Sequence, residues 1–153
     1  MKVPVRYVKL NPIAMVPAYM SAGAAGCDAM ACLEQPMTIE PGARAAIPTG
    51  LSMEIPQGYE VQVRPRSGMA WKKGLTVVNA PGTIDSDYRG EVKILVVNLG
   101  QETVEIAHGD RVAQFVLQAV NQIEWREAAS LSETARGVGG FGSTGVIQPP
   151  TVP

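Results

Sequence analysis

The chain has 153 residues, with 13 basic and 14 acidic side chains and a formal net charge of −1, and this length is typical of one domain with its own hydrophobic core. Such a charge balance provides no overall field for nucleic acid or an anionic membrane. The start, MKVPVRYVKL, carries charges and a proline where a signal peptide is apolar. No apolar run approaches the ~18 residues of a membrane span. We therefore expect a soluble, cytoplasmic protein with no nucleic-acid or membrane partner.

Several short stretches predict β-strands. Residues 59–64 alternate apolar and polar side chains, as in a half-buried strand, whereas residues 93–97 form a mainly continuous apolar run that favours burial on both faces. Residues 111–120 are again mostly strand-like. Turn signals separate these runs at Pro41-Gly42, Pro56-Gln57-Gly58, Pro81-Gly82, Asn98-Leu99-Gly100 and His108-Gly109-Asp110. This spacing indicates an all-β sandwich or barrel.

One short helix is predicted between Ser67, which can cap its start, and Gly74, which can end it. The segment Arg66-Ser67-Gly68 at this start has the groups needed to bind phosphate. Free backbone N–H groups and the helix dipole favour an anion there, and Arg66 adds a forked donor. The alternative interpretation is an N-cap beside a surface arginine.

A second polar segment, Asp85-Ser86-Asp87-Tyr88-Arg89-Gly90, stands between strand-like runs. Its spacing resembles the start of a calcium loop, but arginine at the fifth position and valine at the twelfth exclude calcium. In a β-hairpin, Asp85 can orient or deprotonate a water while Tyr88 packs on a sugar. The alternative is ordinary turn chemistry.

The remaining polar candidates are few. Asp28 can hold the water shell of a metal ion, or it can be a hydrogen-bonded turn aspartate. His108 is the only histidine, which excludes Ser-His-Asp or Cys-His catalysis unless it acts alone. Cys27 and Cys32 fit no zinc pattern, and we interpret them as single buried thiols. No P-loop sequence occurs, which excludes that class of ATPase and GTPase.

From Thr134 onward the composition changes to Gly, Ser, Thr and Pro, which predicts a flexible tail over residues 134–153 after a β-domain over residues 1–133. Within this tail, RGVGGFGSTG (residues 136–145) contains the GxGxxG pattern of a dinucleotide-binding turn. Such a turn needs a βαβ unit of about 30 residues, which this segment lacks. Composition alone favours an inert tail.

In order and spacing, five segments together resemble the five motifs of the trimeric deoxyuridine triphosphatases (dUTPases). They are residues 25–28, 66–68, 79–91, 109–114 and 136–145. The resemblance implies an all-β, jelly-roll-like β-barrel with one short helix and a flexible C-terminal tail. It also implies a homotrimer with active sites at subunit interfaces, and Mg²⁺-dependent hydrolysis of dUTP to dUMP and pyrophosphate.

The resemblance also assigns roles by position. Asp85 would orient the attacking water and contact the sugar 3′-hydroxyl. Tyr88 would stack under the deoxyribose and leave no room for a 2′-hydroxyl. The uracil edge would be read by the hairpin residues Asn79, Gly82, Thr83 and Ile84.

The phosphates and the water would be held by Arg66, Ser67, Gly68 and Gln114, of which Ser67 and Gln114 join Asp85 as catalytic residues. Asp28 would reach Mg²⁺ through water, because in this family the triphosphate oxygens bind most of the ion. The tail would be a lid over a site made by the other two subunits. In it Phe141 would stack on uracil, Arg136 would meet the phosphates, and the terminal phosphates would be wrapped by Gly142, Ser143 and Thr144.

Two other functions compete with this expectation. A dCTP deaminase, or a bifunctional deaminase and dUTPase, resembles the dUTPases in fold, but the segment around Asp85 favours the dUTPase. A non-catalytic dUTPase-like trimer could bind nucleotide as a regulatory module. Loss of a catalytic position is common in such modules, and here Asp85, Tyr88, Arg66 and Phe141 are all present.

Overall fold

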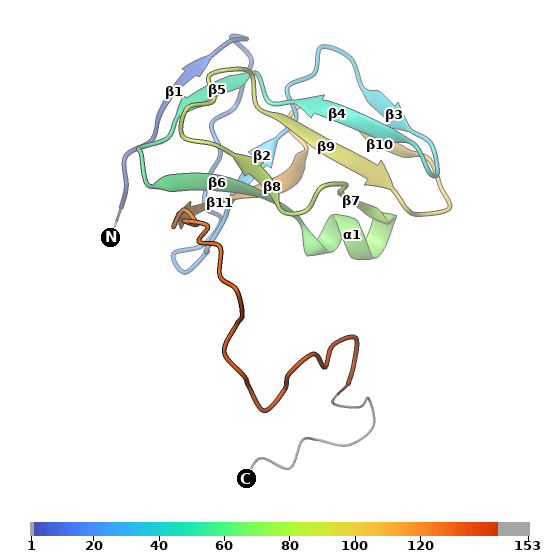
Figure 1. Cartoon of the computed structure of the whole chain (residues 1–153). Coiled ribbons are helices and arrows are strands. Elements are labelled where there is room, and N and C mark those ends of the chain that lie inside the picture. The colour runs from blue at the N-terminus through green and yellow to red at the C-terminus, as the bar shows by residue number, and fades with distance from the viewer. Residues whose placement is uncertain (1, 144–153) are drawn as a thin grey trace. The chain divides into compact units, whose positions relative to one another are not determined.

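The computed structural model describes residues 2–143 of the chain (Figure 1). These residues form one helix, α1 (Ser67–Lys73), and eleven strands. The strands are β1 (Arg6–Lys9), β2 (Cys27–Met30), β3 (Met37–Ile39), β4 (Arg44–Pro48), β5 (Leu51–Glu54), β6 (Tyr59–Pro65), β7 (Leu75–Val77), β8 (Gly82–Ile84), β9 (Lys93–Asn98), β10 (Val104–Ile106) and β11 (Arg111–Ala119). Over residues 2–143, no helix is both long and apolar enough to cross a membrane. The expected all-β class with one short helix is confirmed.

The strands pair only in antiparallel fashion within the described residues. One sheet has the order β2-β11-β6-β8 and another the order β4-β9-β7, while β1 pairs with β5 and β10 with β3. Paired strands are mostly distant in the sequence, as in a jelly roll. The sheets stay separate in their hydrogen bonding and do not close into one continuous ring. The compact unit that contains them ends at Asn121.

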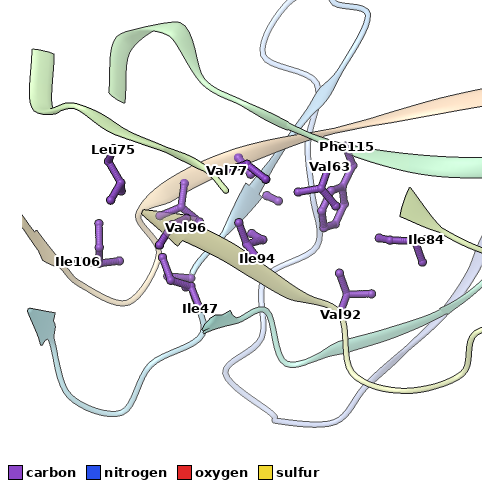
Figure 2. Close-up of a cluster of buried hydrophobic side chains, with 14 of the residues drawn as sticks. Ile47, Val63, Leu75, Val77, Ile84, Val92, Ile94, Val96, Ile106 and Phe115 are labelled. Carbon is purple, nitrogen blue, oxygen red and sulfur yellow. The ribbon is translucent and has the colours of Figure 1, made fainter. Parts of the chain in front are cut away.

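The hydrophobic core lies between the two larger sheets. Its side chains come from β6, β8 and β11 and from β4, β7 and β9, with further contributions from the two small sheets such as Ile39 of β3 and Ile106 of β10 (Figure 2). Burying one such side chain contributes about 1.5–3 kcal/mol to folding. The labelled core residues in Figure 2 are Ile47, Val63, Leu75, Val77, Ile84, Val92, Ile94, Val96, Ile106 and Phe115. This core fixes β6 and β8, which carry much of the candidate site.

The prediction that residues 93–97 are buried on both faces is wrong. In β9, Ile94 and Val96 are buried, but Lys93 is exposed and Leu95 is 41% exposed. The three-stranded sheet has one face on the core and leaves its other face open, so a strand within it buries only alternate side chains. The exposed face of β9 becomes a wall of the cavity described below.

The helix α1 lies beside β7 (Figure 1), and its predicted end is confirmed. Gly74 has φ 68° and donates its backbone N–H to the Ala70 carbonyl, and glycine adopts this left-handed conformation with least strain. The prediction that Ser67 caps the start is wrong. The N-cap is Arg66, which is still extended as it leaves β6, and no side chain caps the helix. Ser67 is therefore the first helical residue.

Candidate active site

A cavity of about 480 Å³ opens beside the turn that joins β8 to β9. Its lining includes all six residues that were predicted from the sequence to contact the base and the sugar. The cavity is lined by Val63, Asn79, Gly82, Thr83, Ile84, Asp85, Tyr88, Glu91, Val92, Lys93 and Leu95. We call it the hairpin cavity. Sequence reasoning missed the walls supplied by Glu91, Val92, Lys93 and Leu95, because they depend on how the chain enters β9 and on which face of β9 is open. It also missed Val63, whose place depends on the pairing of β6 with β8.

The base of the hairpin cavity depends on a close approach at Gly82. This residue is buried and pairs with Val63 across β6 and β8. A Cβ atom at Gly82 would lie 3.2 Å from Asn79 Nδ2 and 3.2 Å from Val63 Cβ. The absence of a side chain therefore lets Asn79 lie against β8. The Ala80–Pro81 peptide just before this strand is cis.

The loop between Asp85 and Val92 is held by its own hydrogen bonds. The Tyr88 hydroxyl donates to the Glu91 carbonyl at 3.0 Å, and the Arg89 guanidinium donates to the Ser86 carbonyl at 2.7 Å. Asp85 is exposed at the start of the loop and lines the cavity. A carboxylate in that position can orient a water molecule at the mouth of the cavity.

A second group of predicted residues meets at the buried carboxylate of Asp28, which is 2% exposed. Arg111 Nη1 lies 3.1 Å and Arg66 Nη2 lies 3.3 Å from its Oδ2 atom. Gln114 Nε2 donates to Oδ1 at 3.0 Å. We call these four residues the Asp28 cluster. Arg111 was not predicted, although it lies in the fourth motif, because strand register was needed to place it.

Strand pairing explains how the Asp28 cluster forms. Gln114 of β11 is the direct neighbour of Asp28 on β2. On the other side of β11, Ala113 pairs with Pro65, so the chain leaves β6 with Arg66 next to the cluster. Arg66 Nη1 also donates to the Arg111 carbonyl at 2.7 Å. The Arg66 guanidinium is thus fixed at two points before any anion arrives.

Ser67 and Gly68 follow Arg66 and are exposed at the first residues of α1. A Cβ atom at Gly68 would meet nothing within 4 Å. Their backbone N–H groups lie in the first turn of the helix, where such groups have no partner within the helix. The segment therefore offers hydrogen-bond donors next to the Asp28 cluster.

The donor atoms of this chain do not fit a metal ion bound directly by the protein. Within residues 2–143, no group of three or more His, Cys, Asp or Glu residues could hold such an ion. Asp28 is buried, and its two oxygens already accept hydrogen bonds from Arg111 and Gln114 and form an ion pair with Arg66. A magnesium ion at this site would have to arrive with a ligand that supplies most of its oxygens.

The cysteines and the histidine are not placed to act as nucleophiles. Burial raises the pKa of the Cys27 thiol and that of the Cys32 thiol, so both stay protonated near neutral pH. Neither forms a disulfide, which confirms that they are single thiols; Cys32 is buried as predicted, whereas Cys27 is only partly buried. His108 is exposed in a turn, where its Nδ1 atom accepts the Leu33 N–H at 3.4 Å.

The described part of the tail makes local turns. Arg136 Nε donates to the Gly139 carbonyl at 2.7 Å, and Ser143 N–H donates to the Gly140 carbonyl at 3.0 Å. The Phe141 side chain is fully exposed, and its backbone has φ 47°. The tail residues placed in the predicted lid are Arg136, Phe141, Gly142 and Ser143, whereas Thr144 lies outside the described residues.

Comparisons with known proteins point to one family. The dUTPase family profile matches residues 13–145. The deoxyuridine 5′-triphosphate nucleotidohydrolase of Desulfotalea psychrophila is 60% identical over 131 residues, which cover 86% of this chain and 87% of the relative. The protein of the same name from Wolinella succinogenes is 54% identical over 144 residues, covering 94% of this chain and 95% of the relative.

Solved structures agree on the fold. The dUTPase of Staphylococcus bacteriophage 80alpha, solved with dUPNHPP, has a TM-score of 0.84 at 25% identity. The match covers 95% of this chain and 100% of the phage chain. The dUTPase from phage phi11 of S. aureus has a TM-score of 0.75 at 22% identity, covering 86% and 100%. A variant of the phi11 protein is described with a structural Mg(II) ion.

Proposed function

This chain belongs to the dUTPase family, and we propose from that membership that it is a dUTP diphosphatase, which hydrolyses dUTP to dUMP and pyrophosphate. The observation that carries the proposal is the hairpin cavity, which Asp85 and Tyr88 line together with the residues of β8. Such an activity belongs to nucleotide metabolism: it removes dUTP and supplies dUMP. We place it in the cytoplasm, where nucleotides are made.

Uracil is read by the edge of β8. This strand is the last one in its sheet: one side of its backbone pairs with β6, and no strand of residues 2–143 pairs with the N–H and C=O groups of its other side. Asn79 adds an amide next to Gly82. Thymine is rejected because its methyl group overlaps the narrow hairpin, and cytosine because its edge leaves these backbone groups unpaired. Sites built on hydrogen bonds discriminate by ~10⁴ or more in favourable cases.

The sugar and the attacking water are placed by the loop after β8. Tyr88 stacks under the deoxyribose and excludes a 2′-hydroxyl, because its ring lines the cavity and is anchored through its hydroxyl. Asp85 contacts the 3′-hydroxyl and holds the water in line with the phosphorus atom that it attacks. Proximity and orientation of this kind supply a large share of a hydrolytic rate enhancement.

The triphosphate is held by Arg66, Gln114 and the backbone of Ser67 and Gly68. Hydrolysis of a phosphoanhydride needs charge neutralisation and an oriented nucleophile more than it needs a covalent intermediate. The Asp28 cluster pre-aligns Arg66 and Gln114. We propose that the substrate is the magnesium complex of dUTP, whose ion is bound by triphosphate oxygens and contacts Asp28 only through water.

We propose a homotrimer with active sites at subunit interfaces. Among the described residues, none of the Asp28 cluster lines the hairpin cavity. A nucleotide that fills the cavity of one copy would extend its phosphates to the cluster of the next. The tail of a third copy, with Arg136, Phe141, Gly142, Ser143 and Thr144, would close over the site and exclude water.

The test is pyrophosphate release by the purified protein with Mg²⁺, run in parallel on dUTP, dTTP, dCTP and UTP. Release from dUTP alone is expected, and it would establish the base and sugar selectivity together. Ammonia release from dCTP would point to the deaminase instead. Binding of dUTP with no turnover of any of the four nucleotides would overturn the proposal in favour of a regulatory nucleotide-binding trimer.

A further inference from the structure

We propose that Gly90 is a positioning residue for the Tyr88 ring, and that the missing side chain at Gly90 sets the preference for deoxyribose over ribose. The inference rests on the proposed function, because that function assigns Tyr88 to the sugar. It adds a residue outside the cavity wall, since Gly90 does not line the hairpin cavity.

The steric relation between the two residues is direct. A Cβ atom at Gly90 would lie 2.7 Å from Tyr88 Cζ and 3.0 Å from Tyr88 Cε2, and closer still to the hydroxyl oxygen. Carbon atoms at such separations overlap, because favourable contact begins near 3.5 Å. The phenol ring therefore occupies the space that any other residue at position 90 would fill.

Backbone freedom does not explain this glycine. Within residues 2–143, the glycines with positive φ are Gly42, Gly50, Gly58, Gly74, Gly109, Gly137 and Gly142. Gly90 is not one of them, so an alanine could adopt its backbone conformation. What position 90 requires is empty space next to the ring.

A hydrogen bond from the ring's hydroxyl holds the ring in this space. The Tyr88 hydroxyl donates to the Glu91 carbonyl at 3.0 Å. Glu91 is fixed in turn, because its Oε1 atom accepts the Gly50 N–H at 3.0 Å. The Arg89 carbonyl between them accepts the Ser52 hydroxyl at 2.7 Å. Position 90 thus lies in a loop that is tied on one side to Ser52 of β5 and on the other to Gly50, the residue just before β5.

A side chain at position 90 would move the ring without disturbing the core. Tyr88 is 47% exposed, and its hydroxyl is the far end of a side chain that can turn toward solvent. The Glu91–Gly50 and Ser52–Arg89 bonds do not involve the ring, so they persist. The fold stays intact, while the wall that excludes a 2′-hydroxyl is displaced.

The experiment compares Gly90→Ala with the parent protein and with Gly23→Ala, whose Cβ would meet nothing within 4 Å. The quantity measured is the ratio of kcat/KM for dUTP to that for UTP. We expect Gly90→Ala to lower this ratio at least tenfold with a melting temperature within a few degrees of the parent, and Gly23→Ala to leave both unchanged. An unchanged ratio in folded Gly90→Ala protein would overturn the proposal.

A double-mutant cycle separates an effect on Tyr88 from a general disturbance of the loop. In a Tyr88→Ala background the ring is gone, so adding Gly90→Ala should not change the ratio further. An equal additional loss in that background would refute the positioning role, and this arm remains informative if Gly90→Ala alone is unstable. Failure of the parent to release pyrophosphate from dUTP would instead refute the proposed function.

Discussion

At the scale of single residues, Asp28 shows how one buried carboxylate can align several binding groups. Its partners are Arg66, just after β6, and Arg111 and Gln114 of β11, which follow it in the sequence by tens of residues; Arg111 lies 83 positions away. Sequence motifs predicted Asp28, Arg66 and Gln114 as site residues, but their mutual contacts depend on strand register. Arg111 was missed for the same reason.

Replacing Asp28 with asparagine should weaken both the fold and substrate binding. The change removes the negative charge that Arg66 and Arg111 share. Losing charge-assisted hydrogen bonds of this kind costs about 1–3 kcal/mol, and the partial exposure of both arginines favours the lower half of that range. Urea unfolding measures the loss, and a raised KM for dUTP would report a misplaced Arg66. Glu124→Gln, which breaks an exposed pair with Arg126, is the control and should change neither.

Replacing Asp85 with asparagine should retain dUTP binding and lose most turnover. The amide is nearly isosteric with the carboxylate but cannot accept a proton from the attacking water, so kcat should fall by roughly 10²–10⁴. Asp87→Asn is the matched control, since Asp87 is exposed in the same loop but does not line the cavity. Steady-state pyrophosphate release and equilibrium binding of dUTP measure the two effects. Equal activity in both variants would contradict the role given to Asp85.

At the scale of elements, the sequence predicted where strands and the helix occur better than it predicted which of their faces are buried. The strands around residues 59–64 and 111–120 were confirmed as β6 and β11, because alternation marks a strand with one buried face. The burial of β9 was predicted wrongly, since a short apolar run does not reveal whether a neighbouring layer covers its second face. The start of α1 was displaced by one residue, because Arg66 continues the extended path of β6.

The end of α1 gives a prediction about stability. Gly74 has φ 68°, and a Cβ there would lie 2.6 Å from the Gly100 Cα atom. Gly74→Ala should therefore combine the cost of a left-handed conformation, about 1 kcal/mol, with a backbone clash. Gly42→Ala provides the comparison, because its φ is 77° but its Cβ would meet nothing within 4 Å. Urea unfolding should show a clearly larger loss for Gly74→Ala; equal losses would mean that the clash relaxes freely.

At the scale of the whole molecule, the sequence predicts the folding of the compact unit more directly than it predicts the assembly of several copies. The buried hydrophobic residues of the described chain lie between Ala14 and Val116, so folding of the compact unit follows from composition and periodicity. The proposed trimer and lid follow only from resemblance to a family, because no local pattern records what a second copy contributes. Within one copy of the chain, no residue of the Asp28 cluster lines the hairpin cavity, so the proposed joining of the two depends on a second copy.

Removing residues 136–153 should leave the stability of the protein unchanged and abolish most of its activity. No buried core residue of the described chain lies beyond Val116, so the melting temperature and the oligomeric state in sedimentation should remain those of the full chain. Pyrophosphate release from dUTP should fall severely, since the phosphates would lose Arg136 and the base would lose Phe141. A truncated protein with full activity would refute the lid.

The internal carboxylate of the Asp28 cluster has a consequence for the empty enzyme in a cell. Two guanidinium charges less one carboxylate leave a single positive charge at the cluster, so the resting site attracts anions only weakly. Orthophosphate and ribonucleotides would otherwise compete for an unneutralised pair of arginines. A counter-ion within the protein thus holds Arg66, Arg111 and Gln114 in place and at the same time limits the charge that a competing anion would meet.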